Sequence, residues 1–170
     1  NGERSWQPKN YTEEYLGWIN LRTAFARSVN TVAAKLGNEI GIGYIIETAR
    51  RLGIVSPLPE VPSLALGVAE LSPTELLRAY AIIANRGYFD NLTVIRSITH
   101  EDSTRFAHYI YEPKQLFDPG PIDMVRSLLR SVFLEGTAQR ANALGFDRPA
   151  AGKTGTTNNH RDSWFAGFTN

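Results

Sequence analysis

The order of helical and strand-like segments along the chain constrains its fold more than any other feature. Helical spacing of apolar residues dominates residues 1–90 and returns at 112–145, whereas 91–111 has the pattern of a hairpin and 146–170 that of sheet strands. Helices and strands do not alternate one by one, so the crossovers of a parallel sheet are not expected. The sequence therefore predicts all or part of a single α+β domain, with a helical subdomain and antiparallel strands.

The first half of the chain is expected to contain three short helices. Apolar spacing predicts them at residues 21–26, 31–36 and 42–49. Gly37 directly follows the second, and glycine is the residue most often found just beyond a helix C-terminus. We therefore expect the second helix to stop at Gly37.

A fourth helix has the clearest boundaries in the sequence. Ser72 is its expected N-cap, Pro73 is its first residue, and Glu75 completes a capping box with Ser72. Gly87 is expected to terminate the segment. The predicted buried face consists of Leu77, Tyr80, Ala81 and Ala84.

The second half of the chain adds strands and one further helix. Residues 92–99 and 106–111 predict two strands. The apolar positions of 125–133 predict an amphipathic helix. Segments 150–156 and 163–168 are expected to pair as antiparallel strands, joined by the polar turn that separates them.

Charge, cysteine content and hydropathy exclude several classes of function. The net charge of +1 predicts no strong attraction to nucleic acid. The absence of cysteine excludes disulfides and thiolate-bound metals, and no apolar run approaches the ~18 residues of a membrane span. His100, His108 and His160 lack metal-ligand spacing, so neither a metal nor a cofactor is expected.

Two short motifs carry the candidate chemistry. They are Ser28-Val29-Asn30 and, far downstream, Lys153-Thr154-Gly155-Thr156. Taken alone, the first is read more simply as an N-cap for the helix at residue 31, and the second as a strand entering a turn. A phosphate-binding loop would need a glycine where Asp147 stands and a helix after Thr154, and neither is expected here.

The order of the two motifs matches a known set. Serine acyl enzymes of the penicillin-binding and β-lactamase group use Ser-x-x-Lys, then Ser-x-Asn, then Lys-Thr-Gly. The surrounding sequence is similar to the transpeptidase domain of class A penicillin-binding proteins from about Trp6 to the C-terminus. The segments that carry this resemblance are 21–30, 64–73, 79–81, 85–87, 136–138, 151–157 and 162–167.

One part of the family pattern is absent. No serine in the 170 residues has a lysine three positions later. The resemblance places the nucleophilic serine and its lysine N-terminal to this segment, and Asn1 is not a natural start residue. We therefore expect the chain to need the missing N-terminal part of the same domain as its partner, and to be inactive alone.

The resemblance implies roles for the residues of both motifs. Ser28, Asn30 and Lys153 are the implied catalytic residues, with Ser28 linking the nucleophile's surroundings to Lys153. If residues 28–30 are extended, the side chains of Ser28 and Asn30 point to the same side, which lets Asn30 reach the substrate amide or the missing lysine. This arrangement would serve proton transfer around the serine and the departing amine.

The Lys-Thr-Gly strand is the implied substrate-binding wall. Thr154 and Thr156 offer hydroxyls to the substrate carboxylate, and Gly155 permits close approach of the substrate backbone. The implied reaction is D,D-transpeptidation of peptidoglycan stem peptides ending in D-Ala-D-Ala through a serine acyl enzyme, which β-lactams also form.

The resemblance also implies a cellular setting, and two other functions stay open. A class A protein is a bifunctional glycosyltransferase and transpeptidase on the extracytoplasmic side of the bacterial cytoplasmic membrane, with its anchor outside this segment. One alternative is a non-catalytic module that binds or senses peptidoglycan or β-lactams. The other is a β-lactamase-related hydrolase, which the segments around residues 21 and 64 disfavour.

Overall fold

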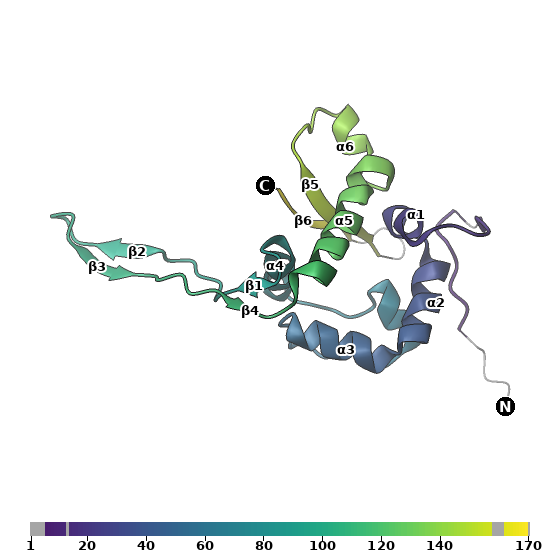
Figure 1. Cartoon of the computed structure of the whole chain (residues 1–170), viewed down its shortest axis with the longest axis horizontal. Helices are drawn as coiled ribbons and strands as arrows, with labels where there is room; N and C mark the ends of the chain where they lie inside the picture. The colour runs from purple at the N-terminus through teal and green to yellow at the C-terminus, as the bar shows by residue number, and fades with distance from the viewer. Residues whose placement is uncertain (1–5, 13, 158–161, 170) are drawn as a thin grey trace.

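A computed structural model describes residues 6–12, 14–157 and 162–169. Its helices and the β5–β6 pair form one body, from which a narrow hairpin projects as an arm (Figure 1). The helices are α1 (Leu21–Ala26), α2 (Asn30–Ile40), α3 (Ile42–Arg51), the 3-10 helix η1 (Pro62–Leu66), α4 (Pro73–Ala84), α5 (Pro119–Glu135) and α6 (Arg140–Ala143). The strands are β1 (Tyr88–Phe89), β2 (Ser97–Thr99), β3 (Arg105–His108), β4 (Lys114–Gln115), β5 (Ala150–Thr156) and β6 (Ser163–Thr169).

Three separate antiparallel pairs make up the strand content of the described residues. They are β1–β4, β2–β3 and β5–β6. The predicted α+β class is therefore confirmed. Among the described residues, no helix combines the length and the apolar character needed to cross a membrane.

Helix α5 is the central element of the body. It packs against α1, α4 and β5, and its apolar stripe is buried, with Leu129 3% and Val132 0% exposed. The hydroxyl of Ser131, which is also fully buried, donates to the carbonyl of Leu128 at 2.6 Å. Burying this stripe removes apolar surface from water, and this holds α1 and β5 against the same helix.

Helix α2 does not stop at Gly37, so that prediction is wrong. The helix continues to Ile40, and Gly37 is buried within it. A Cβ at this position would lie 2.6 Å from the Cβ of Ala65 in η1. The glycine therefore serves close packing of α2 on η1 rather than helix termination.

Helix α4 begins with the predicted capping box. Ser72 accepts from the Glu75 backbone N–H, and the Glu75 carboxylate accepts from the Ser72 backbone N–H. The predicted buried face is wrong at Leu77, which is 57% exposed. The buried apolar positions are instead Ala79 and Ile82, one helical turn apart.

The projecting arm has shorter strands than the sequence predicts. Residues 92–96 and 109–111 lie outside β2 and β3, and the register shifts between Ile98 and Thr99. No described residue covers either side of the arm, since Val94 is 102% and Phe106 70% exposed. A two-stranded ribbon without a packing layer gains little from extending its ladder, which explains the short strands.

The β5–β6 pair carries the second motif in a regular ladder. Lys153 pairs with Ala166 and Thr154 with Phe165. The strand bounds agree with the prediction to within one residue. Thr157 and Asp162 close the ladder through a backbone hydrogen bond of 3.1 Å. The rest of the predicted turn, residues 158–161 with His160, lies outside the described residues.

Exchanging two helical glycines for alanine should separate packing from helix propensity. Gly37→Ala is expected to destabilise the chain by about 1–3 kcal/mol, because its methyl group meets Ala65. Gly43→Ala in α3 meets nothing within 4 Å and should stabilise by about 0.5 kcal/mol. Urea unfolding of both variants checks this, and equal effects would contradict the packing role of Gly37.

The carboxylate of Glu75 joins the start of α4 to the loop after α3. It accepts from the backbone N–H groups of Val55 and Ser56 at 2.6 and 2.7 Å, and from the Ser56 hydroxyl at 2.6 Å. These bonds favour the charged form. The Ser56 hydroxyl, followed by the backbone donors, holds the pKa of Glu75 far below its ordinary value of 4.5.

Glu75 should therefore make stability depend on acid pH. The unfolded chain takes up the proton first as the pH falls, so the stabilisation is complete above pH 4.5 and is lost below it. Glu75→Gln is expected to lower the urea midpoint at pH 7 and to flatten its dependence on pH between 5 and 3. Glu47→Gln, at an exposed position of α3, is the control. An unchanged acid profile in Glu75→Gln would contradict this role.

Candidate active site

Ser28 lies at the junction between α1 and α2 in a conformation unusual for its residue type. Its φ is 56°, in the left-handed region that costs a non-glycine residue about 1 kcal/mol. Its N–H donates to Phe25 O and the next N–H, of Val29, to Ala24 O. Asn30 is already the first residue of α2. The extended 28–30 segment considered from sequence is therefore wrong. The Ser28 hydroxyl contacts Lys153, whereas the Asn30 amide contacts the carbonyl of Lys9.

The start of α2 is capped by a residue that sequence reasoning missed. Ser28 makes no capping bond, so the simple N-cap interpretation also fails. Instead, the buried Asn10 accepts from both the backbone N–H and the hydroxyl of Thr31 at 3.1 Å. Asn30 donates its amide to the carbonyl of Lys9 at 2.9 Å. The segment at residues 9–10 thus clamps the first motif, and no local sequence signal identifies such a long-range cap.

Lys153 connects the second motif to the first by a side-chain hydrogen bond. Its Nζ donates to the Ser28 Oγ at 2.9 Å and to the Thr154 carbonyl at 3.2 Å. The side chain is half-buried, and no carboxylate of the described residues lies within ion-pair distance of it. Burial lowers the pKa of Lys153 below its ordinary value of 10.5.

The remaining residues of the second motif present polar groups along one end of β5. The Thr154 hydroxyl lies 2.6 Å from the hydroxyl of Thr137. Gly155 has open space where a side chain would stand, and Thr156 is exposed. Together they form a strand surface that a ligand can approach.

Thr137 is a second residue that the sequence did not single out for this site. Its segment, 136–138, is one of those that resemble the family. It lies just after α5, and its N–H donates to Ala26 O at 3.1 Å. Gly136 makes this approach possible, because a Cβ there would collide with the Ala26 carbonyl. The end of α5 therefore touches α1 and places a hydroxyl beside β5.

The resulting arrangement suits proton movement rather than metal binding. A hydroxyl can accept from an ammonium while donating to another group, and Ser28 is exposed on its remaining side. A lysine with a lowered pKa exchanges protons more readily near neutral pH. The described part of the chain contains no cluster of three or more His, Cys, Asp or Glu side chains placed to hold a metal ion.

An α+β fold that joins a Ser-x-Asn junction to a Lys-Thr-Gly strand defines the penicillin-binding protein and β-lactamase class. Comparison with known proteins identifies the family within this class to which the chain belongs. The family model for the penicillin binding protein transpeptidase domain matches residues 1–170, and the chain belongs to this family. The resemblance identified from sequence is thereby confirmed.

Relatives at the sequence level are penicillin-binding proteins 1A. The protein from Aquifex aeolicus is 38% identical over 164 residues, which cover 96% of this chain and 22% of that protein. The protein from Neisseria gonorrhoeae is 38% identical over 169 residues and is matched over 21% of its length. The chain thus spans about a fifth of the length of these relatives.

Solved structures support the fold. Penicillin-Binding Protein 1A from Haemophilus influenzae superposes with a TM-score of 0.87 at 26% identity, over 98% of this chain and 31% of that one. An imipenem acyl-enzyme complex of penicillin-binding protein A from M. tuberculosis superposes with a TM-score of 0.82, over 97% of this chain and 43% of that one. At 21% identity, the second likeness supports the fold alone.

The ammonium of Lys153 should titrate below an ordinary lysine. The charged form loses hydration on burial, so the pKa is expected to lie below 10.5 in the folded chain. A ¹³Cε NMR titration of Lys153 measures it, with the same residue in the urea-unfolded chain as the control. A folded-state midpoint at or above the unfolded one would contradict the stated environment.

Proposed function

We propose that the chain is the proton-handling and substrate-binding part of a peptidoglycan D,D-transpeptidase. The observation that carries this proposal is the 2.9 Å hydrogen bond from Lys153 to Ser28, which joins the two family motifs. The nucleophilic serine is supplied by a segment outside these 170 residues, since none of their serines has a lysine three positions later. The isolated chain is therefore inactive.

The proposed reaction follows covalent catalysis in two steps. The external serine oxygen bonds to the penultimate D-alanine carbonyl, the C–N bond to the terminal D-alanine breaks, and the serine proton passes to that departing amine. An amine of a second stem peptide then attacks the ester carbonyl. The C–O bond to the serine breaks, the amine gives up a proton to the serine oxygen, and the new amide is the cross-link. Ser28 and Lys153 relay the proton, because their hydroxyl and ammonium are already hydrogen-bonded.

The strand β5 holds the substrate in this proposal. The Thr154 and Thr156 hydroxyls and the charge of Lys153 attract the terminal carboxylate. The Thr156 backbone N–H serves as one oxyanion donor, and Gly155 leaves room for the peptide backbone. Asn30 donates one amide N–H to Lys9, so its oxygen and its second N–H remain for the substrate amide or the missing lysine.

β-Lactams acylate the same serine in this proposal. An acyl-enzyme complex is known for the M. tuberculosis protein of the same fold. We place the parent protein on the extracytoplasmic side of the bacterial cytoplasmic membrane, as a bifunctional glycosyltransferase and transpeptidase. A non-catalytic binding module is the second candidate, favoured by the missing Ser-x-x-Lys in these residues.

Acylation by penicillin tests the proposal. The full-length protein should form a stoichiometric adduct on a serine outside residues 1–170, and the 170-residue chain alone should form none. Lys153→Ala is expected to slow acylation by about 10²–10⁴-fold, the usual contribution of a general acid–base group. Mass spectrometry over time measures this.

Two controls make the acylation experiment decisive. Lys114→Ala removes an exposed lysine of β4 and should leave the rate unchanged. An adduct on Ser28 or another serine of this chain would overturn the external nucleophile. Lack of any adduct on the full-length protein would favour the binding module.

A further inference from the structure

A cavity of about 330 Å³ borders α1, α5 and the β5–β6 pair, and neither Ser28 nor Lys153 lines it. Its volume lies within the range of small-ligand sites. Three arginines line it, with Asp123 as the only acid among its lining residues. We propose that this cavity binds a small oxyanion, a carboxylate or a phosphate group, between Arg22, Arg126 and Arg130.

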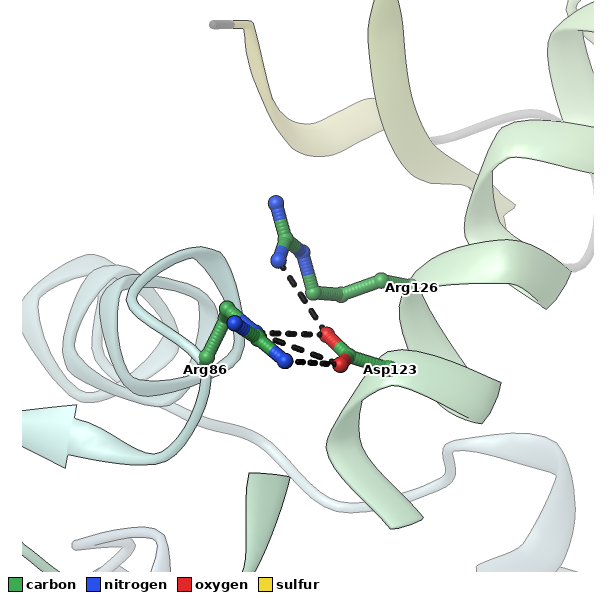
Figure 2. A network of polar contacts seen from close by, with 3 residues as sticks. All are labelled: Arg86, Asp123 and Arg126. Atoms are coloured by element: carbon green, nitrogen blue, oxygen red, sulfur yellow. Dashed lines mark hydrogen bonds and ion pairs between the residues drawn. The ribbon is translucent and has the colours of Figure 1, made fainter. Parts of the chain in front are cut away.

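The one acid at the cavity is already engaged. Arg86, which does not line the cavity, donates to both oxygens of Asp123, with its shortest contact at 2.6 Å (Figure 2). Arg126 reaches the same carboxylate from α5 at 3.3 Å. One negative charge is thus shared by the guanidinium groups of Arg86 and Arg126. No further acid lines the cavity to balance the charges of Arg22 and Arg130.

Neither Arg22 nor Arg130 has an acidic partner among the described residues. Arg22 donates to the carbonyl and the hydroxyl of Ser127, at 3.2 and 2.7 Å, and both acceptors are neutral. The Arg130 side chain has no hydrogen bond or ion pair with any described residue. Arg126 and Arg130 are also four residues apart on one helix, where like charges repel. A bound anion removes this repulsion.

The chemistry of the cavity selects oxyanions. A guanidinium group presents a planar fork that matches the oxygens of a carboxylate or a phosphate. Arg126 is held in place, with its side chain only 27% exposed and its guanidinium 5.9 Å from the Phe168 ring centroid. The buried Ala151 adds an apolar wall on one side.

The anion can come from two sources that share this chemistry. One is the carboxylate of an acidic side chain or peptide, and the other is a phosphate monoester. Acetate and inorganic phosphate are the matching probes. Tighter binding of acetate at constant ionic strength assigns the site to carboxylates, and tighter binding of phosphate assigns it to phosphates.

NMR of the arginine Nε–Hε groups of the full-length protein, with residues 1–170 isotopically labelled, tests the proposal. Saturable shifts are expected at Arg22, Arg126 and Arg130 on titration with either probe. Arg130→Gln should weaken binding at least about tenfold, equivalent to about 1.4 kcal/mol. Arg130→Lys keeps the positive charge but loses the planar fork. Its affinity for the probe should therefore lie between the affinities of the unmodified chain and of Arg130→Gln. Arg105→Gln on the exposed β3 is the control and should bind like the unmodified chain.

Two outcomes would overturn the proposal. One is a set of small, non-saturating shifts spread over all arginines, which indicates general ionic screening. The other is unchanged affinity in both Arg130 variants, when their circular dichroism shows them folded.

Discussion

The packing of one helix determines where the chemistry of this chain can occur. The apolar stripe of α5, with Leu129 and Val132 at its centre, is buried while the helix packs against α1 and β5. Ser28 follows α1 and Lys153 belongs to β5, so burial of this stripe sets the distance between them. The 2.9 Å hydrogen bond between the two side chains depends on hydrophobic packing that involves neither.

The site itself is built at a local cost in stability. Ser28 adopts a left-handed backbone, and the half-buried Lys153 has no described carboxylate to balance its charge. Such features persist only where the surroundings fix them, and they are common at functional sites. Here the surroundings are the cap that Asn10 gives to α2 and the close contact of Gly136 with Ala26.

Electrostatics differ between the two regions of functional interest. At the motifs, an ammonium faces neutral hydroxyl and carbonyl groups, so it is ready to donate a proton or to attract a substrate carboxylate. At the arginine-lined cavity, the excess of guanidinium groups over carboxylates favours a bound oxyanion. Both regions draw residues from β5 and from the elements that α5 holds against it.

The sequence by itself determined the fold class, the capping box of α4, the β5–β6 pair and the two motifs, because each depends on local spacing or on a short ordered pattern. Only the tertiary structure decided that Gly37 packs within a helix, that Leu77 is exposed, that Ser28 is left-handed, and that Asn10 and Thr137 join the site. These features arise from contacts between segments distant in the chain. Local propensity does not predict such contacts, because the free energy of packing is gained only when the distant segments meet.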